Sequence, residues 1–402
     1  MNALRRCIAV PSPDFAEQYW GRRPLLTRAA QLPARFDDLL GESAVDELLS
    51  RRGLRTPFLR MAKDGDIVAP ARYTRGGGAG AGAGDQVADD MVLQQLDDGA
   101  TLVLQALHRT WPPLVAFGSQ LSGELGHPVQ INAYVTPPQN RGFAAHYDVH
   151  DVFVLQVAGR KQWRVHSPVL ADPLRDQPWE QRRTAVAQRA RETPLIDEVL
   201  APGDALYLPR GYLHSAVAVG ELSIHLTVGV HPLTRYQLVR HLLDAAASDP
   251  ALRMSLPMGV DLGDPAVLEP HLRDTVSALR SYLDTISVEP VAERITSDLI
   301  RQTRAAPIAP LEQLAAAESV DAATLMRLRP GLRCTLVRDD AGLRLRMLDK
   351  AVPLPLGAEA ALKTVLVGRA FAPGELPGLD PVEQLALVRT LLREAVVVPA
   401  VL

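Results

Sequence analysis

Short, closely spaced apolar runs fill the middle of the chain and constrain its fold more than any other feature. Each run is rich in Val, Ile, Leu or aromatic residues, and Gly, Pro or Asp separates it from the next. Between about residues 100 and 232 the runs read TLVLQAL, PVQINAYVTP, DVFVLQVAG, KQWRVHSP, DALYLP, HSAVAV and LSIHLTVGVHP. Many short strands at this spacing predict a β-sandwich or a β-barrel. The Arg- and Gln-rich segment 174–193 interrupts them and is expected to be helical.

The chain changes character after this β-rich region. From 234 to about 300 the apolar residues recur at helical spacing, which predicts a helical segment. The remaining residues predict a smaller α+β unit with a hairpin around Asp340-Ala341-Gly342. A length of 402 residues is consistent with two or three domains. We therefore expect three: 1–232, 233–304 and 305–402.

Composition and low-complexity features exclude several classes of protein. The chain has 43 basic and 46 acidic residues and a net charge of −3, which argues against a polybasic membrane binder or a polyanion coat. No segment approaches the roughly 18 apolar residues of a membrane span. Cys7 and Cys334 give no disulfide framework, so a reducing cytoplasm is the expected location. The GGGAGAGAG stretch over 76–84 predicts an exposed loop, because no Gly-Lys-Ser/Thr follows to make a phosphate loop.

The residues that bear chemistry begin with His146-Tyr147-Asp148, followed far along the chain by His214. In a strand, residues i and i+2 share a face, so His146 and Asp148 are expected to point the same way. Two imidazoles and one carboxylate leave metal positions open, and this is the ligand set of non-haem Fe(II) oxygenases. The same set also accepts Mn, Co, Ni or Zn. A lone His-x-Asp is common by chance, and taken alone His146 is more often a packed or surface histidine.

Two further motifs give the chain a family resemblance. The element Pro202–His214 has the form G-x5-P-x-G-x2-H and resembles the second motif of cupins, although Ala218 stands where many cupins have a polar residue. The stretch His146–Val165, HYDVHDVFVLQVAGRKQWRV, resembles the JmjC-type oxygenases, and within them the ribosomal oxygenases, which hydroxylate ribosomal proteins. The opening FAEQYWGRRPLL from Phe15 resembles the N-terminal entry of that family.

The resemblance implies a fold in three parts. The first is a mainly β catalytic domain, a double-stranded β-helix or cupin jelly roll of the JmjC type. A helical dimerisation segment follows, and a small α+β, winged-helix-like domain ends the chain. This order is the same as the order of the segments read from the sequence patterns alone.

The resemblance also implies roles for individual residues. His146, Asp148 and His214 would hold Fe(II), and Lys161 would hold the distal carboxylate of 2-oxoglutarate. Tyr134 and Thr227 match positions whose hydroxyls bond the same carboxylate, and Asn132 shares a face with Tyr134 and would contact the cosubstrate. Each has a plainer interpretation: a solvated Lys, a core Tyr, a strand Thr and a strand-edge amide.

Other side chains near these motifs also have a functional and a structural interpretation. His150 is expected to line a substrate pocket or to pack. His225 is expected beside the site or in the core, and Trp163 in the core. His166 and His231 fall near strand ends and are expected at the surface. The mouth of the pocket is expected to involve Gln105, His108 and the 174–193 insertion.

The resemblance implies an Fe(II)- and 2-oxoglutarate-dependent dioxygenase that hydroxylates a side chain of a ribosomal protein. Two alternatives remain: the same chemistry on a small molecule or an RNA base, and a cupin scaffold that only binds. The complete set of His146, Asp148, His214 and Lys161 disfavours the last. A homodimer is expected. Direct DNA binding is not expected, because the C-terminal segment is near neutral in charge and phosphate contacts require a basic face.

Overall fold

The computed structural model describes residues 2–63, 65–138, 140, 143–339, 342–347 and 350–400. The chain divides into two compact units, Met1–Pro232 and Leu233–Leu402, and each is described by itself. The expected three-domain division stays a prediction. None of the described helices has the length and apolar character that crossing a membrane requires.

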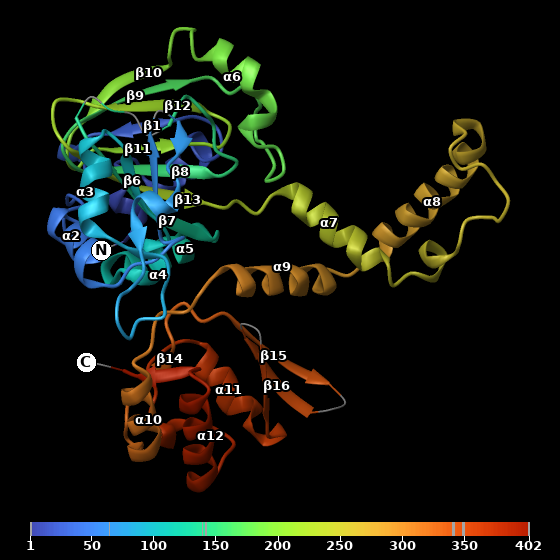
Figure 1. Cartoon of the computed structure of the whole chain (residues 1–402). Helices are drawn as coiled ribbons and strands as arrows, with labels where there is room; N and C mark the ends of the chain where they lie inside the picture. Colours follow the sequence, from blue (N-terminus) through green and yellow to red (C-terminus); the bar gives the residue numbers. More distant parts are fainter. Residues whose placement is uncertain are drawn as a thin grey trace. The chain divides into compact units, whose positions relative to one another are not determined.

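The first unit is built on a large antiparallel sheet of eight strands among the described residues (Figure 1). In spatial order these strands are β1 (Leu25–Thr27), β11 (Ala205–Leu208), β8 (Asp151–Ala158), β13 (Ser223–Val230), β7 (Val129–Thr136), β6 (Thr101–Leu104), β2 (Leu59–Lys63) and β3 (Asp66–Ile67). β6, β7, β8, β11 and β13 fall on apolar runs that predict strands. The strand signal in the sequence is therefore confirmed for the centre of this sheet.

A second, smaller sheet lies over part of the first, at the top of Figure 1. Its strands in order are β10 (Ile196–Leu200), β9 (Lys161–His166) and β12 (Leu213–Ala218). The sequence pattern predicts β9 and β12 but not β10, whose sequence IDEVL carries two acidic residues. The two facing sheets are the arrangement expected for a jelly roll.

Strand β8 shows why this sequence folds between two layers. Almost every residue of DVFVLQVA is buried. Val152 and Val154 pack between the two sheets with Trp163 and Leu206. The alternate residues Phe153, Leu155 and Val157 belong to the large core on the opposite face of the sheet. A strand buried on both faces reads as a continuous apolar run, and this is the pattern seen here.

Helices of the first unit cover the outer face of the large sheet. They are α1 (Ser12–Gln18), α2 (Glu42–Arg51), α3 (Asp89–Asp97), α4 (Leu107–Thr110) and α5 (Pro112–Leu125), and α6 (Arg183–Arg189) lies in the 174–193 insertion. Helix α5 begins with proline at its first position and ends at Gly126, whose φ is 71°. A Cβ on Gly118 would lie 3.1 Å from Cδ1 of Ile131, so this glycine lets α5 approach β7 closely. The Gly/Ala stretch 76–84 lies between β4 (Thr74–Arg75) and β5 (Gln86–Val87).

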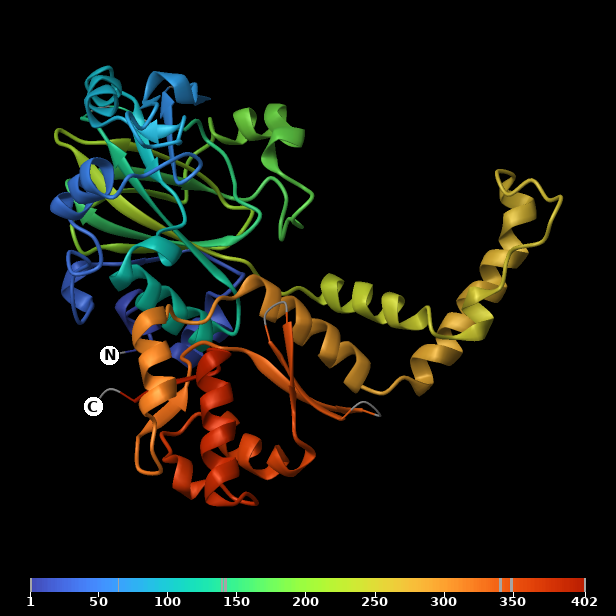
Figure 2. The ribbon, with the colours of Figure 1, turned by 60° about the horizontal axis from the view of Figure 1, so that its bottom comes forward.

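The second unit begins with three helices, α7 (Arg235–Ala246), α8 (Pro265–Thr285) and α9 (Glu289–Gln302), as the helical spacing predicts. The hydroxyl of Thr234 caps α7 by accepting from the N–H of Gln237 at 3.2 Å. Helices α7 and α9 lie side by side in both Figure 1 and Figure 2. His241 and Asp298 join them through an Nε2–Oδ2 distance of 2.9 Å.

The rest of the second unit mixes helices and strands around its own core. Its helices are α10 (Pro310–Ser319), α11 (Glu359–Leu366) and α12 (Pro381–Arg393), and its strands are β14 (Met326–Leu328), β15 (Cys334–Asp339), β16 (Gly342–Met347), β17 (Lys350–Leu354) and β18 (Val397–Pro399). Strands β15 and β16 pair antiparallel, as the hairpin prediction requires. The turn residues Asp340 and Ala341 themselves lie outside the described residues.

Candidate metal and cosubstrate site

A pocket of about 230 Å³ opens between the two sheets of the first unit. Its wall takes residues from β6, β7, β8, β9, β12 and β13, and from the segment before β8. All seven residues expected at the site line it: Asn132, Tyr134, His146, Asp148, Lys161, His214 and Thr227. The structure therefore brings all seven together around one cavity.

His146, Asp148 and His214 lie close together in the lining of this pocket. Each offers a ligand atom, and these atoms all lie within 4.8 Å of one another. The imidazole centroids of His146 and His214 are 4.5 Å apart. Nε2 of His214 lies 3.6 Å from Oδ2 of Asp148. Among the described residues, this is the cluster of His, Cys, Asp and Glu side chains that could hold a metal ion.

The backbone that carries these ligands differs from the expectation. His146 and Asp148 precede β8 and do not lie in a regular strand, so the prediction of a strand over His-x-Asp is wrong. His146 instead forms an isolated β-bridge with His214, with N–O distances of 3.1 and 2.8 Å. The carbonyl of Asp148 accepts from the N–H of Gly211 at 3.0 Å. The ligands are thus fixed by a local pairing of two short segments.

Hydrogen bonds to backbone carbonyls orient both imidazoles. Nδ1 of His146 lies 2.8 Å from the carbonyl oxygen of Ala144, and Nδ1 of His214 lies 3.1 Å from that of Tyr212. A carbonyl oxygen only accepts, so the proton of each ring stays on Nδ1. The lone pair of each Nε2 is left for another partner. Metal-binding histidines are commonly oriented by this kind of bond.

The electrostatics of the cluster favour ligands without protons. Burial lowers the pKa of His214 to about 4, and the neighbouring His146 adds to this effect. Burial by itself would raise the pKa of Asp148, but His150, His214 and His146 outweigh it and the pKa lies below its ordinary value. At neutral pH the cluster therefore presents a neutral imidazole and a carboxylate. Metal ligation requires these protonation states, and the donor set fits a divalent transition metal.

Lys161 lines the pocket at the start of β9. Its side chain is buried, with 4% of the residue exposed. Nζ donates to the hydroxyl of Thr136 at 2.9 Å, and that hydroxyl lies 3.2 Å from the hydroxyl of Thr101. Burial lowers the pKa of Lys161 to about 7. A buried cation with no described carboxylate partner is suited to receive an anionic ligand.

Thr136 and Thr101 are site residues that the sequence reading missed. Thr136 is two residues past Tyr134, so strand periodicity puts it on the same face as Asn132 and Tyr134. That periodicity could have identified it. Thr101 lies on β6, and nothing in TLVL distinguishes a pocket threonine from an ordinary strand threonine.

Tyr134, Asn132 and Thr227 lie along the pocket wall on adjacent strands. The Tyr134 ring stacks on His225 at 4.9 Å. The side-chain oxygen of Asn132 accepts from the N–H of Ala106 at 3.0 Å and holds that residue at a φ of 56°. Thr227 pairs across the strands with Asn132. The side-chain oxygen of Asn132 therefore fixes the backbone at Ala106.

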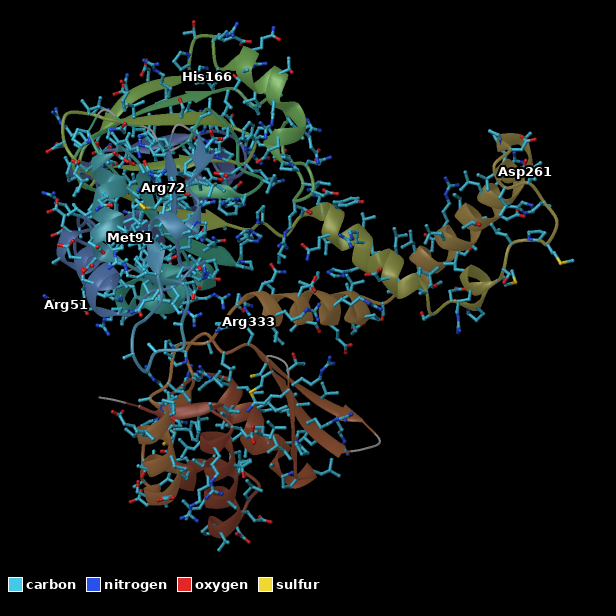
Figure 3. The ribbon with its side chains drawn as sticks, viewed as in Figure 1. Arg51, Arg72, Met91, His166, Asp261 and Arg333 are labelled. Carbon is cyan, nitrogen blue, oxygen red and sulfur yellow. The ribbon has the colours of Figure 1, made fainter. Side chains whose placement is uncertain are left out.

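The remaining histidines divide between wall and core. His225 is buried and lines the pocket, where burial, followed by Lys161, keeps its pKa well below the ordinary value. His150 lines the pocket and stacks on His231 at 5.1 Å. His231 is half-buried just after β13, so the expectation that it lies at the surface is met only in part. The expectation of a surface position is wrong for His166, which ends β9 as a buried residue and is labelled in Figure 3.

Arg60 is another pocket residue that the sequence did not predict. It comes from β2, lines the pocket, and lies with its guanidinium 5.4 Å from the centroid of the Phe143 ring. Burial raises the pKa of Tyr134 while the guanidinium of Arg60 opposes that rise. In a chain whose basic residues are almost all arginine, the sequence carries no signal that separates this one.

Amide side chains form part of the pocket lining. Gln105, Gln130 and Asn132 all line the pocket, and a place for Gln105 at its mouth stays a prediction. The amide nitrogen of Gln105 donates to the carbonyl of Pro57. His108 is not among the described lining residues, and its Nδ1 instead accepts from the N–H of Ile131 at 3.1 Å. No described residue of 174–193 lines the pocket, although Trp179 lies 6.3 Å from the His146 ring.

Comparison with known proteins gives this geometry a context. Residues 119–238 match the sequence model of the JmjC domain. The bifunctional lysine-specific demethylase and histidyl-hydroxylase NO66 of Aedes aegypti is 26% identical over 317 residues, which cover 75% of this chain and 47% of that protein. Ribosomal oxygenase 1 of Gallus gallus is 30% identical over 263 residues, covering 63% of this chain and 42% of that protein. The chain thus spans less than half the length of these relatives.

Solved structures agree with the fold. The Escherichia coli ribosomal oxygenase YcfD superposes with a TM-score of 0.58 at 19% identity, covering 97% of this chain and 98% of that one. YcfD has also been solved with cobalt and 2-oxoglutarate, and that structure superposes with a TM-score of 0.57 at 18% identity over 97% of this chain and 98% of its own. The protein thus contains a JmjC domain and has the JmjC cupin fold seen in a bacterial ribosomal oxygenase.

Proposed function

We propose that this protein is an Fe(II)- and 2-oxoglutarate-dependent oxygenase that hydroxylates a side chain of a ribosomal protein. One observation carries the proposal. Two imidazoles and a carboxylate gather within 4.8 Å in the lining of a pocket that the buried ammonium of Lys161 also lines. An anion that also binds a metal would bridge the cluster and the ammonium.

The residues take the following roles in this proposal. His146, Asp148 and His214 hold Fe(II). Lys161, Tyr134 and Thr227 hold the distal carboxylate of 2-oxoglutarate, and Asn132 contacts the cosubstrate; Thr136 and Thr101 join this set through the bond of Thr136 to Lys161. Iron and 2-oxoglutarate together would supply the activation of O2 that hydroxylation needs.

The chain's own residues orient the cosubstrate and exclude water. The ammonium of Lys161 neutralises the carboxylate in a buried place, where a charge-assisted hydrogen bond is strong. His225 and Trp163 pack edge to face at 5.3 Å, and both are buried in the pocket lining. Their bulk takes up room that water would otherwise fill, and a dry site strengthens the polar contacts inside it.

The mouth of the pocket supports a polypeptide substrate. Three neutral amides, Gln105, Gln130 and Asn132, offer donors and acceptors that suit a peptide. Besides Asp148, the described lining residues carry two cations, Arg60 and Lys161, and no second carboxylate. A cationic acceptor side chain would meet repulsion there, so a neutral one such as histidine is favoured. The name of the NO66 relative, a histidyl-hydroxylase, supports the same choice.

Two other hypotheses about the function compete with this proposal. The same chemistry on a small molecule or an RNA base would use the same metal and cosubstrate residues, and it differs only in what enters the mouth. A binding scaffold without catalysis would need no metal cluster, and the paired orientation of His146 and His214 argues against it. The relatives named as ribosomal oxygenases support the protein substrate.

The second unit has its own proposed roles. We place a homodimer contact on α7, α8 and α9, because these helices expose large apolar side chains such as Leu238, Leu243 and Leu272. The unit that follows them is proposed to be winged-helix-like and to act without direct DNA binding. Both cysteines are free thiols, which supports a reducing cytoplasm as the location.

The experiment that tests the function couples binding to turnover. The purified protein is titrated with Fe(II) and 2-oxoglutarate without oxygen, and succinate is then measured in air with and without purified ribosomes. The proposal expects binding of both, with succinate formation that rises when ribosomes are present. Binding with slow succinate formation that ribosomes do not change would favour a small molecule or an RNA base. Absence of 2-oxoglutarate binding would leave only the binding scaffold.

A further inference from the structure

The segment between β9 and β10, residues 167–195, packs against both short segments that carry the metal-ligand residues. We call it the β9–β10 insertion; it contains α6, drawn in green in Figure 1. A separate apolar cluster forms there, apart from the two larger cores of the first unit. Its buried members are Tyr147, Val186 and Leu213, and Ala145, Val149, Val169, Trp179 and Ala190 pack against them.

The positions of these members in the chain are informative. Tyr147 lies between His146 and Asp148, and Leu213 directly precedes His214. Both are almost fully buried, and both belong to the apolar cluster that contains Val186 of α6. The insertion therefore contributes a buried side chain to the cluster in which both ligand-bearing segments pack. A change at Val186 would reach the ligands without touching the pocket, since Val186 is not among the described lining residues.

Two polar contacts fasten the same insertion to the ligand segments. The hydroxyl of Tyr147 donates to the carbonyl of Gln177 at 3.0 Å. The side-chain oxygen of Gln177 accepts in turn from the N–H of Leu174 at 3.0 Å. Tyr147 is therefore held by packing and by a hydrogen bond. This also restrains the backbone of its neighbours in sequence, His146 and Asp148.

A third contact reaches Asp148 from another direction. Gly211 has a φ of +86°, and a Cβ there would lie 2.4 Å from the carbonyl oxygen of Leu170. The start of the insertion thus packs tightly on the turn that contains Gly211. The N–H of Gly211 donates to the carbonyl of Asp148 at 3.0 Å. Arg210 in the same turn pairs with Asp172 of the insertion at 3.2 Å.

We propose that the β9–β10 insertion positions His146, Asp148 and His214 for metal binding, with Tyr147 and Val186 as its positioning residues. This rests on the proposed metal site and adds the reason for the insertion's place in the fold. His214 lies in β12, but the segment of His146 and Asp148 forms only an isolated bridge with it, so the insertion supplies the order that a regular strand would otherwise give to that segment. Residues that orient metal ligands commonly change metal affinity about 10- to 100-fold when they are replaced.

The test measures Co(II) affinity directly, without turnover, by titrating the full-length apo protein and following the visible absorption of the bound ion. Val186→Ala removes the support under both segments, and Tyr147→Phe removes only the bond to Gln177. Val45→Ala is the matched control, since Val45 is also a buried helical valine but belongs to the core around α2. Thermal unfolding of each apo protein reports the loss of stability, and circular dichroism confirms that each is folded.

The proposal expects Val186→Ala to weaken Co(II) binding about tenfold and to change the absorption spectrum of the bound ion. Tyr147→Phe should weaken binding several-fold, and Val186→Ile should keep near-normal affinity. Val45→Ala should lose stability but keep its affinity. Equal Co(II) affinity in the wild type, Val186→Ala and Tyr147→Phe would overturn the positioning role while leaving the proposed function intact. Absence of Co(II) binding by the wild type would overturn both.

Discussion

The ammonium of Lys161 donates to the hydroxyl of Thr136 over 2.9 Å, and Thr136 in turn shares a hydrogen bond with Thr101. The two threonine hydroxyls carry one proton each, and the hydrogen bond between them uses one of these protons. The pair therefore keeps one O–H donor beside the buried ammonium. A carboxylate that enters this end of the pocket meets a charge and a hydroxyl at once.

Replacing Lys161 with methionine should mainly raise the requirement for 2-oxoglutarate. Loss of a charge-assisted hydrogen bond costs about 1.5–3 kcal/mol, or roughly a 10- to 100-fold rise in Kd. Thr136→Val should cost less, about 0.5–1.5 kcal/mol. Isothermal titration with 2-oxoglutarate measures both. Lys63→Met, on the exposed end of β2, is the control. An unchanged Kd in Lys161→Met would remove this lysine from the cosubstrate site.

The pKa of Lys161 predicts a pH dependence of cosubstrate binding. Burial lowers this pKa to about 7, so above that pH the free protein holds a neutral amine. A bound carboxylate favours the ammonium and raises the pKa again. Binding above pH 7 must therefore take up a proton, and affinity should fall by up to about tenfold per pH unit.

Calorimetry in two buffers of different ionisation enthalpy detects that proton uptake. The wild type should show it at pH 8, whereas Lys161→Arg should not, because a guanidinium stays charged throughout this range. Binding enthalpies at pH 8 that are the same in both buffers for the wild type would contradict the prediction.

Replacing a metal-ligand residue should abolish turnover and leave the fold intact. A metal at a hundred times its Kd stabilises the wild type by about 2.7 kcal/mol, or about 5–10 °C in Tm. His146→Ala and Asp148→Ala should lose this rise on addition of Co(II), while their apo Tm values change little. His271→Ala on α8 should behave like the wild type. Full turnover by His146→Ala would show that the ligand assignment is wrong.

The expected dimer contact gives a prediction for the second unit. Leu238 and Leu243 on α7 are 41% and 49% exposed. Replacing both with Glu should prevent association, because burying two carboxylates in an apolar contact is costly. Sedimentation should then give the chain mass of 43.6 kDa instead of twice that value. Leu311→Glu on α10, an even more exposed position outside these helices, should leave the assembly unchanged. A wild type that sediments at the chain mass would contradict the dimer itself.

Much of the catalytic fold follows from sequence periodicity, and its failures have physical causes. β8 is predicted because a strand buried on both faces must be apolar throughout. β10 is missed because an edge strand tolerates the acids Asp197 and Glu198. The segment around His146 is predicted as a strand because local spacing cannot tell a strand from a two-residue bridge to a distant partner.

The residues of the site likewise divide into those that the sequence predicts and those that it does not. The three residues that could hold a metal, and Lys161, are picked out in the sequence because His-x-Asp, the later His and the Gly-Arg-Lys turn carry a strong motif, and the structure places all four around one pocket. Thr101 and Arg60 are missed because their roles arise only where β2, β6 and β7 pair side by side, whereas the i+2 spacing from Tyr134 could have identified Thr136. His166 is assigned to the surface from its place at a strand end, whereas the packing around β9 buries it.

The most direct test of the central claim is mass spectrometry of ribosomal proteins after reaction with the purified protein, Fe(II), 2-oxoglutarate and isotopically heavy oxygen gas. The account predicts that one side chain of one ribosomal protein, a neutral residue such as histidine, gains a single heavy oxygen atom. The gain should be absent with Asp148→Ala and without 2-oxoglutarate. Succinate formation without incorporation of oxygen into any ribosomal protein would contradict the claim.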